Sequence, residues 1–312
     1  MNAQIMLTIG LYAPVQEQLE KSFTCHRLYE AADRDAFLKK HAPNVRALAT
    51  FGKWGADKAL IAALPTLEII ANMGVGVDAI DLDESKRRGI IVTNTPDVLN
   101  DCVAETAMSL VLNVLHRFPQ CEAYMRSGYW ATRGAPPLAA EAKGKTLGIL
   151  GLGRIGVAVA KLGQAFGMKV RYHSRSKKKV PYPYDSSPEL LGKNSDVLLI
   201  ATSGGEQTRF LVNAKVLDAL GPTGYLVNIS RGSVIDEPVL IRYLKEGRIA
   251  GAGLDVFENE PDVNPEFFAL QNAVVYPHVG SATNETRLAM GMLQVDNLRA
   301  HFSGKPVLTR VV

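Results

Sequence analysis

Residues 146–167 read TLGILGLGRIGVAVAKLGQAFG and contain the pattern Gly-x-Gly-x-x-Gly at Gly151, Gly153 and Gly156. An apolar run precedes the glycines, an amphipathic helical stretch follows them, and a second strand-like run begins about thirteen residues later. Gly151 permits a tight turn, Gly153 lets the backbone approach a pyrophosphate, and Gly156 allows close packing of helix on strand. This context predicts a dinucleotide-binding unit. A plain strand-turn-helix corner and an S-adenosylmethionine site are the alternatives.

Short apolar runs alternate with helical patterns along the whole chain. The predicted strands are 5–11, 45–51, 67–73, 90–94, 146–151, 169–174, 197–202, 224–230, 252–256 and 273–277. The predicted helices are 15–23, 34–41, 56–64, 101–117 and 284–302. Such alternation is typical of α/β proteins with parallel sheets covered by helices on both faces. We therefore predict two doubly wound parallel-sheet domains, a Rossmann-type cofactor domain and a flavodoxin-like substrate domain, with a cleft between them.

The domain boundaries follow from this pattern and from the length of 312 residues, which suits two domains better than one. We assign 99–285 to the dinucleotide-binding domain. The final helix is too small to be a domain and is expected to pack on the first unit. The substrate-binding domain is therefore predicted to be discontinuous, comprising 1–98 and 286–312.

Composition excludes several classes of protein. The net charge of +4 is diffuse and forms no basic stripe with interleaved aromatic residues, so we predict no nucleic-acid partner. Three cysteines and six histidines show no metal-ligand spacing, and we predict no metal. No apolar run approaches the roughly 18 residues needed to cross a bilayer, and the N-terminus resembles a strand more than a signal peptide. We expect a cytoplasmic protein without membrane contact.

Three polar residues follow the ends of predicted strands. Arg231 comes after YLVNIS, Glu260 lies in GLDVFENEP, and His278 comes after VVYP. Ligands of open parallel sheets bind at the carboxyl ends of strands, so we expect these side chains in one crevice. A guanidinium can hold a carboxylate, an imidazole can deliver a proton, and a nearby carboxylate orients the imidazole. With a nicotinamide, this set would reduce a 2-oxo acid. Each residue alone could also be a solvated loop residue, and Glu258 rivals Glu260.

The stretch RYHSRSKKKV at 171–180 is basic where an NAD-selective unit usually carries an acid. It lies about seventeen residues after Gly156, where a carboxylate would bind the ribose 2′-hydroxyl. Ser174 and Ser176 offer hydroxyl donors, and Arg175 offers a planar cation for a 2′-phosphate. We predict NADP(H) as the preferred cofactor and NAD(H) as a weaker one. The alternative is a solvated loop, which we favour only for Lys178 and Lys179.

These motifs together resemble a known family. GLGRIG, NISRG, GAGLDVFENEP, PHVGSAT, ANMGVGVDAIDL and NTPDVLNDCVAETAMSLVL are similar, in order and spacing, to the D-isomer-specific 2-hydroxyacid dehydrogenases. The resemblance covers nearly the whole chain and is strongest to the NADPH-dependent glyoxylate/hydroxypyruvate reductase branch, which includes hydroxyphenylpyruvate reductases. It implies that Arg231, Glu260 and His278 are catalytic.

The resemblance also implies further site residues. The backbone N–H groups of Val75 and Gly76 would bind the substrate carboxylate, and Asp255 would contact the nicotinamide carboxamide. The full set that we assign to the cofactor is Gly151, Gly153, Arg154, Ile155, Gly156, Ser174, Arg175, Ser176, Ile229 and Asp255. Family members are usually homodimers, and we place that contact on the 101–117 helix and the 119–145 segment.

Two departures from the family affect the interpretation. ATSGGEQTR at 201–209 has Ser-Gly-Gly where many relatives have Pro-Leu-Thr, so contacts near the phosphates are expected to differ. These 312 residues do not include the regulatory domain of many phosphoglycerate dehydrogenases, so we expect a different activity. We predict NADPH-dependent reduction of glyoxylate and hydroxypyruvate to D-2-hydroxy acids. The alternatives are an aromatic 2-oxo acid reductase, in which Trp54 could stack on the substrate, and a non-catalytic NAD(P)H-sensing protein of the corepressor type.

Overall fold

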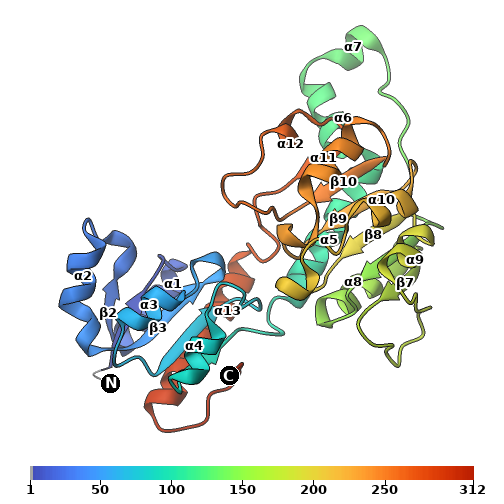
Figure 1. Ribbon diagram of the computed structural model, residues 1–312. Helices are drawn as coiled ribbons and strands as arrows, with labels where there is room; N and C mark the ends of the chain where they lie inside the picture. Colours follow the sequence, from blue (N-terminus) through green and yellow to red (C-terminus); the bar gives the residue numbers. More distant parts are fainter. Residues whose placement is uncertain (1–2) are drawn as a thin grey trace. The chain divides into compact units, whose positions relative to one another are not determined.

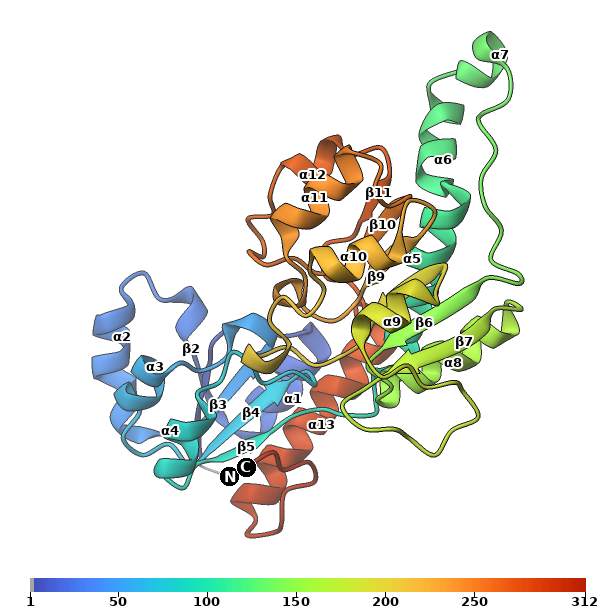
Figure 2. The same ribbon diagram turned by 45° about the vertical axis from the view of Figure 1, so that its right-hand side comes forward.

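The structure is a computed structural model that describes residues 3–312 and divides into two units. Unit 1 contains Met1–Leu99 and Ser281–Val312, and unit 2 contains Asn100–Gly280. Each unit has its own parallel β-sheet, as Figures 1 and 2 show. The ranges predicted from the sequence differ from this division by one residue at the first boundary and by five at the second.

Unit 1 contains a five-stranded sheet with the order β2-β1-β3-β4-β5, and all of its strand pairs are parallel. This is the flavodoxin-like order that the sequence predicted. Its strands are β1 (Gln4–Leu7), β2 (Thr24–Arg27), β3 (Val45–Phe51), β4 (Ile69–Met73) and β5 (Ile91–Thr93). Its helices are α1 (Ala13–Ser22), α2 (Arg34–His41), α3 (Lys58–Ala63), α4 (Leu82–Arg87) and α13 (Asn284–Phe302).

The helix α13 packs on the sheet of unit 1. Its Val295 and Leu298 join a buried cluster with strand residues such as Ile5 and Ala71. Its Gln294 side chain donates hydrogen bonds to the carbonyls of Thr50 and Ala71, at 2.9 and 2.7 Å. The last helix of the chain therefore completes the core of its first hundred residues.

Unit 2 contains a six-stranded sheet with the order β11-β10-β9-β8-β6-β7, again parallel throughout. The chain runs from β6 to β7 on one side and then returns to β8 on the other side, so the strand order reverses between β6 and β8. Tyr184 adds a single parallel bridge outside β7, to Tyr172. Ligands of such sheets bind at the reversal point, beyond the carboxyl ends of the strands.

The strands of unit 2 are β6 (Thr146–Leu150), β7 (Lys169–His173), β8 (Val197–Ile200), β9 (Tyr225–Asn228), β10 (Gly251–Leu254) and β11 (Ala273–Val275). Its helices are α5 (Asn100–His116), α6 (Phe118–Arg126), α7 (Tyr129–Arg133), α8 (Arg154–Ala165), α9 (Pro188–Lys193), α10 (Ala214–Leu220), α11 (Glu237–Lys245) and α12 (Glu266–Ala269). All six strands predicted for this part of the chain are present.

Helices cover both faces of this sheet. Successive strand residues point to opposite sides, so apolar side chains on each face are buried beneath a helical layer. Leu198, Leu226 and Leu254 pack with buried residues of α9, α10 and α11 in one core cluster. On the opposite face Gly253 lies beneath α5, where a Cβ would meet Leu110 at 3.1 Å. Two helical layers thus enclose the sheet, and its carboxyl edge is formed by loops.

Several short elements were not predicted from the sequence. The strand β2 reads TCHR and has no buried residue, because it is the edge strand of its sheet. The helices α6 and α7 also bury none of their residues, and at nine and five residues they are shorter than the stretch over which a helical pattern is recognised. In both views these two helices project from the rest of unit 2 (Figures 1 and 2).

Candidate active site at the carboxyl edge of unit 2

The glycine turn joins β6 to α8, and its three glycines differ in what surrounds them. Gly151 has φ of 102°, and a Cβ there would lie 2.6 Å from the backbone nitrogen of Thr202. A Cβ on Gly156 would lie 2.4 Å from the carbonyl oxygen of Gly151. A Cβ on Gly153 would meet nothing within 4 Å among the described residues. Gly151 and Gly156 therefore serve packing, whereas Gly153 borders open space at the N-terminus of α8.

This difference predicts opposite outcomes for two alanine variants. Gly156→Ala should destabilise folding by about 1–3 kcal/mol, because the new methyl overlaps backbone that has no room to move. Gly153→Ala should keep the thermal unfolding temperature of the parent but bind a dinucleotide much more weakly, because the methyl occupies the open space. Thermal unfolding and cofactor titration measure the two effects. Parent-like cofactor affinity in Gly153→Ala would show that phosphates do not lie against this turn.

Arg231 lies three residues after the end of β9 and is held by its neighbours. Its carbonyl accepts a hydrogen bond from the Asn228 side chain at 2.9 Å, and its Nη1 donates to the carbonyl of Ser230 at 2.8 Å. The Ser230 hydroxyl in turn donates to the carbonyl of Thr202, after β8, at 2.6 Å. The ends of β8 and β9 are thus tied together, and the guanidinium is anchored to the Ser230 carbonyl.

Two glycines allow the loops around Arg231 to approach each other. A Cβ on Gly204 would lie 2.7 Å from Cγ of Arg231, so the arginine stem lies directly against this glycine. A Cβ on Gly232 would lie 1.9 Å from the carbonyl carbon of Phe257. Gly204 belongs to the Ser-Gly-Gly departure from the family pattern, and its lack of a side chain accommodates Arg231.

Glu260 and His278 form a direct pair. His278 Nδ1 lies 2.6 Å from Glu260 Oε2, and the other carboxylate oxygen accepts the backbone N–H of Phe257 at 2.9 Å. Burial alone would raise the pKa of Glu260. The hydrogen bond and charge of His278, the Phe257 N–H and the charge of Arg231 outweigh burial and hold that pKa below its usual value. The carboxylate is therefore ionised at neutral pH, and Nε2 is the ring nitrogen left for a substrate.

The loop that carries Glu260 is supported by a second carboxylate. Glu237, at the start of α11, is buried and accepts the backbone N–H of Glu258 at 2.6 Å. The Glu258 side chain forms an ion pair with Arg209 at 2.8 Å. Glu258, the alternative candidate for this carboxylate, thus has a different partner, and the histidine pairs with Glu260.

Asp255 fixes the backbone next to His278. It follows β10, is 1% exposed, and accepts the N–H groups of Val279 and Gly280 at 2.7 and 2.8 Å, one on each oxygen. Burial raises the pKa of Asp255, and these two hydrogen bonds and the charge of His278 only partly oppose it. His278 has φ of 55°, which is uncommon for a residue other than glycine. The two hydrogen bonds to Asp255 fix the backbone of Val279 and Gly280, which directly follow His278. They thereby help to hold His278 in this uncommon conformation.

The basic stretch begins beside the glycine turn. The backbone N–H of Gly151 donates to the carbonyl of His173, the last residue of β7, at 2.8 Å. The hydroxyl of Ser174 donates to the carbonyl of Ser176 at 2.9 Å, so its proton is already engaged within the loop. The Arg175 side chain is exposed and forms no hydrogen bond or ion pair with residues 3–312.

Val75 and Gly76 lie in unit 1, after β4. Asn94 donates to the carbonyl of Val75 and Asn72 donates to the carbonyl of Gly76, both at 2.9 Å. Within the described part of the chain, their own N–H groups donate to nothing. Side-chain amides therefore hold this loop by its carbonyls and leave two adjacent donors available.

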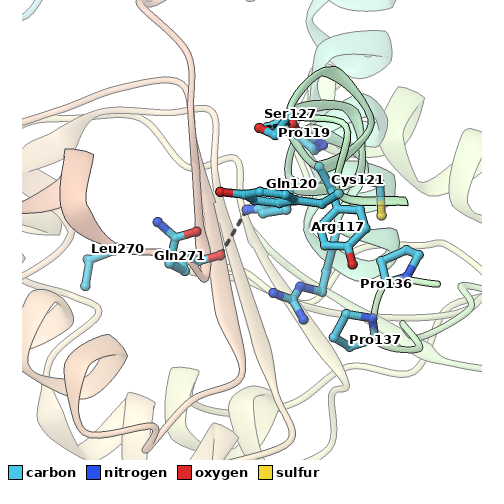
Figure 3. A pocket seen from close by; sticks show the side chains of 12 residues that line it. Arg117, Pro119, Gln120, Cys121, Ser127, Pro136, Pro137, Leu270 and Gln271 are labelled. Carbon is cyan, nitrogen blue, oxygen red and sulfur yellow. Dashed lines mark hydrogen bonds between the residues drawn. The ribbon is translucent and has the colours of Figure 1, made fainter. Parts of the chain in front are cut away.

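A cavity of about 420 Å³ lies elsewhere in unit 2, between the α6–α7 segment and the loop before β11. Figure 3 shows Gln120 reaching from α6 to the carbonyl of Gln271, a hydrogen bond of 3.0 Å. The predicted catalytic and cofactor residues do not line it. Residues 3–312 contain no cluster of three or more His, Cys, Asp or Glu side chains suited to a metal ion, and no helix there is long and apolar enough to cross a membrane.

Sequence reasoning missed the supporting residues of this site. The glycine of NISRG at 232 and the glycines after β8 carried a usable signal, since glycines beside a strand end indicate close backbone approach. The two hydrogen bonds of Asp255 had no comparable signal, because its partners lie more than twenty residues away.

The fold and this set of strand-end residues define a nucleotide-dependent oxidoreductase, and comparisons with known proteins define the family. The family model for the NAD-binding domain of D-isomer specific 2-hydroxyacid dehydrogenases matches residues 108–280. A glyoxylate/hydroxypyruvate reductase A of Arabidopsis thaliana is 46% identical over 309 residues, covering 99% of this chain and 98% of that protein. A hydroxyphenylpyruvate reductase of Plectranthus scutellarioides is 48% identical over 310 residues, covering 99% and 98%.

A solved structure agrees with these sequences. The crystal structure of an NADPH-dependent glyoxylate/hydroxypyruvate reductase from Sinorhizobium meliloti, in complex with NADP and malonate, is 42% identical and has a TM-score of 0.95. The match covers 100% of this chain and 97% of that one. The chain therefore belongs to the D-isomer specific 2-hydroxyacid dehydrogenase family and is an oxidoreductase, as its motifs predicted.

Proposed function

We propose that the protein is an NADPH-dependent reductase of small 2-oxo acids such as glyoxylate and hydroxypyruvate, and that it forms D-2-hydroxy acids. The observation that carries this proposal is the pair of His278 and Glu260, 2.6 Å apart, with Arg231 contributing to the electrostatics of the same carboxylate. In this proposal unit 2 binds the dinucleotide and unit 1 contributes to substrate binding. The prediction of a cytoplasmic enzyme remains a prediction.

Each catalytic residue has a role that its chemistry permits. A nicotinamide cofactor held by unit 2 would supply the hydride for the carbonyl carbon of the substrate. Nε2 of protonated His278 donates its proton to the carbonyl oxygen, which becomes the hydroxyl of the product. Glu260 stays ionised and orients the ring through Nδ1. Arg231 holds the substrate carboxylate, a role for which the N–H groups of Val75 and Gly76 in unit 1 are also candidates.

The residues around the glycine turn fit a dinucleotide. Gly153 borders open space where a Cβ would intrude, and the first turn of α8 begins one residue later, at Arg154. Helix N-termini present free N–H groups and a partial positive charge, which suit a pyrophosphate. Arg154 and Ile155 would lie beside the phosphates, and Ile229 and Asp255 would lie toward the nicotinamide.

Preference for NADP(H) is assigned to Arg175 and Ser176, with NAD(H) as the weaker cofactor. Arg175→Ala should raise the KM for NADPH by about tenfold or more, because a charge-assisted contact to the 2′-phosphate is worth about 1.5–3 kcal/mol. The KM for NADH, which lacks that phosphate, should change less than about twofold. Steady-state kinetics with both cofactors measure the ratio, and Lys179→Ala is the matched control for loss of a nearby charge. Equal losses for both cofactors would refute the assignment.

The preferred substrate is tested by a panel of 2-oxo acids. We expect higher kcat/KM for glyoxylate and hydroxypyruvate than for phenylpyruvate and hydroxyphenylpyruvate, with NADPH consumption as the signal. An aromatic substrate is the second candidate, because a hydroxyphenylpyruvate reductase is 48% identical to this chain. Trp54, which is 47% exposed in unit 1, is the residue that could stack on such a substrate. Tight cofactor binding without turnover of any of these acids would instead indicate a sensor.

We also propose that two copies associate through unit 2. The segment containing α6 and α7 exposes large apolar side chains: Met125 and Trp130 are 59% and 62% exposed, and Leu138 is 98% exposed. Such side chains are costly to leave in water, and a second copy of this segment would cover them. The helix α5, included in the predicted contact, is largely buried within unit 2 itself. Analytical ultracentrifugation should give twice the mass of one chain. The Leu138→Arg variant should shift the measured mass toward that of a monomer.

A further inference from the structure

The basic loop that follows β7 has no regular secondary structure between Ser174 and Pro183. It nevertheless carries Arg175, which in the proposed function faces a 2′-phosphate, and the neighbouring cation of Lys177. A charged loop can discriminate between two cofactors only if its backbone is held in one conformation, because ordering it at the moment of binding would cost affinity. The contacts that hold this loop therefore decide how well it can select a cofactor.

One side chain is bonded to the middle of the loop. Tyr172 of β7 is 0% exposed, yet its hydroxyl reaches the backbone of Lys178, six residues ahead. The hydroxyl accepts the N–H of Lys178 at 2.7 Å and donates to the carbonyl of the same residue at 3.2 Å. A single hydroxyl thus satisfies both polar groups of one loop residue, and it closes the segment from 172 to 178 into a ring.

The backbone of the same tyrosine holds the far end of the loop. Its N–H donates to the carbonyl of Pro183 at 3.0 Å, and its carbonyl accepts the N–H of Asp185 at 2.9 Å. The Asp185 carboxylate, which is 1% exposed, binds Arg171 of β7 through two hydrogen bonds of 2.9 and 2.6 Å. The returning chain is therefore fixed on β7 by several contacts. In the middle of the loop the Tyr172 hydroxyl holds the backbone of Lys178, and at its start the Ser174 carbonyl accepts the Tyr184 hydroxyl at 3.3 Å.

We propose that Tyr172 is a positioning residue for cofactor selection: its hydroxyl holds the loop so that Arg175 and Lys177 are presented to the 2′-phosphate of NADP(H). The inference rests on the proposed NADP(H) preference, and it assigns the preference to a buried tyrosine in addition to the exposed cations. Tyr172 touches no cofactor in this proposal and acts only through the loop.

The test is Tyr172→Phe, which keeps the buried ring and removes only the hydroxyl. We expect the KM for NADPH to rise about fivefold, the equivalent of the roughly 1 kcal/mol that one net hydrogen bond contributes. The KM for NADH and kcat with either cofactor should change less than about twofold. A general loosening of the structure would instead raise both KM values together or lower kcat, and this outcome would overturn the proposal.

Tyr182→Phe is the matched control, because Tyr182 lies in the same loop and its hydroxyl bonds to Gln164 of α8 at 3.0 Å rather than to the basic segment. It should leave the NADPH to NADH ratio unchanged, and an equal shift would contradict a specific role for Tyr172. In the double variant Tyr172→Phe/Arg175→Ala, most of the Tyr172 effect should vanish, because both changes act on one contact. Fully additive losses would contradict the proposal.

Arg175→Ala alone separates this inference from the function on which it rests. If Arg175→Ala lowers NADPH affinity selectively and Tyr172→Phe does not, the inference is wrong and the proposed NADP(H) preference stands. If neither variant changes the ratio of the two cofactors, the preference itself is wrong.

Discussion

His278→Ala should lower kcat for reduction of a 2-oxo acid by about a hundredfold to ten-thousandfold, the usual range for loss of a general acid. Water can replace the proton donor, but Glu260 does not orient a water molecule toward the carbonyl oxygen as it orients the His278 ring. Cofactor affinity should remain near that of the parent, because His278 is placed at the substrate and not at the phosphates. Stopped-flow reduction and cofactor titration measure the two quantities separately.

A second variant and a matched control keep this prediction interpretable. His278→Asn tolerates the positive φ of 55° and provides no acid, so it should lose turnover as His278→Ala does while unfolding at the parent temperature. His301→Ala removes another histidine paired with a glutamate, His301 Nε2 to Glu68 Oε2 at 2.9 Å in unit 1, and should retain turnover. Equal losses of turnover and cofactor affinity in both His278 variants would indicate a structural histidine.

Arg231→Ala should lower kcat/KM for a 2-oxo acid by about a hundredfold, which corresponds to roughly 3 kcal/mol for a charged hydrogen-bonded contact. The loss arises because the substrate carboxylate leaves water without its cation. Part of it comes from Glu260, whose pKa is also lowered by the charge of Arg231. Arg231→Lys should recover only part of the loss, since an ammonium lacks the planar fork of donors.

The control for Arg231 is Arg248→Ala. Arg248 lies just before β10, at the end of the sheet where the strands begin, and it pairs there with Asp218. Its removal should leave kcat/KM unchanged. A comparable loss in both variants would mean that the effect comes from net charge, and a parent-like Arg231→Ala would remove Arg231 from the substrate site.

The sequence alone determined the fold class and the strand-end residues, because both depend on local pattern. Buried parallel strands are typically continuous apolar runs. Most of the six strands of unit 2 were visible as such, although β7 reads KVRYH. The turn around Gly151 was recognisable because tight turns and close helix packing require glycine at fixed spacing. Arg231, Glu260 and His278 could be named because they lie in loops that follow strands, and such loops meet at the carboxyl edge of a parallel sheet. The edge strand β2 was missed because an edge strand needs no apolar run.

Only the tertiary structure decided which groups support these residues. Asp255 binds backbone groups more than twenty residues away, and Tyr172 binds the backbone of a loop residue six positions ahead. Gly204 and Gly232 matter through atoms of other loops. It also distinguished Glu260 from Glu258, since each is a loop carboxylate in the same short segment and only the fold brings one of them to His278. The physical reason is that local periodicity records which side of an element is buried. Hydrogen bonds between loops depend on where separate strands end in space, and no local pattern encodes that.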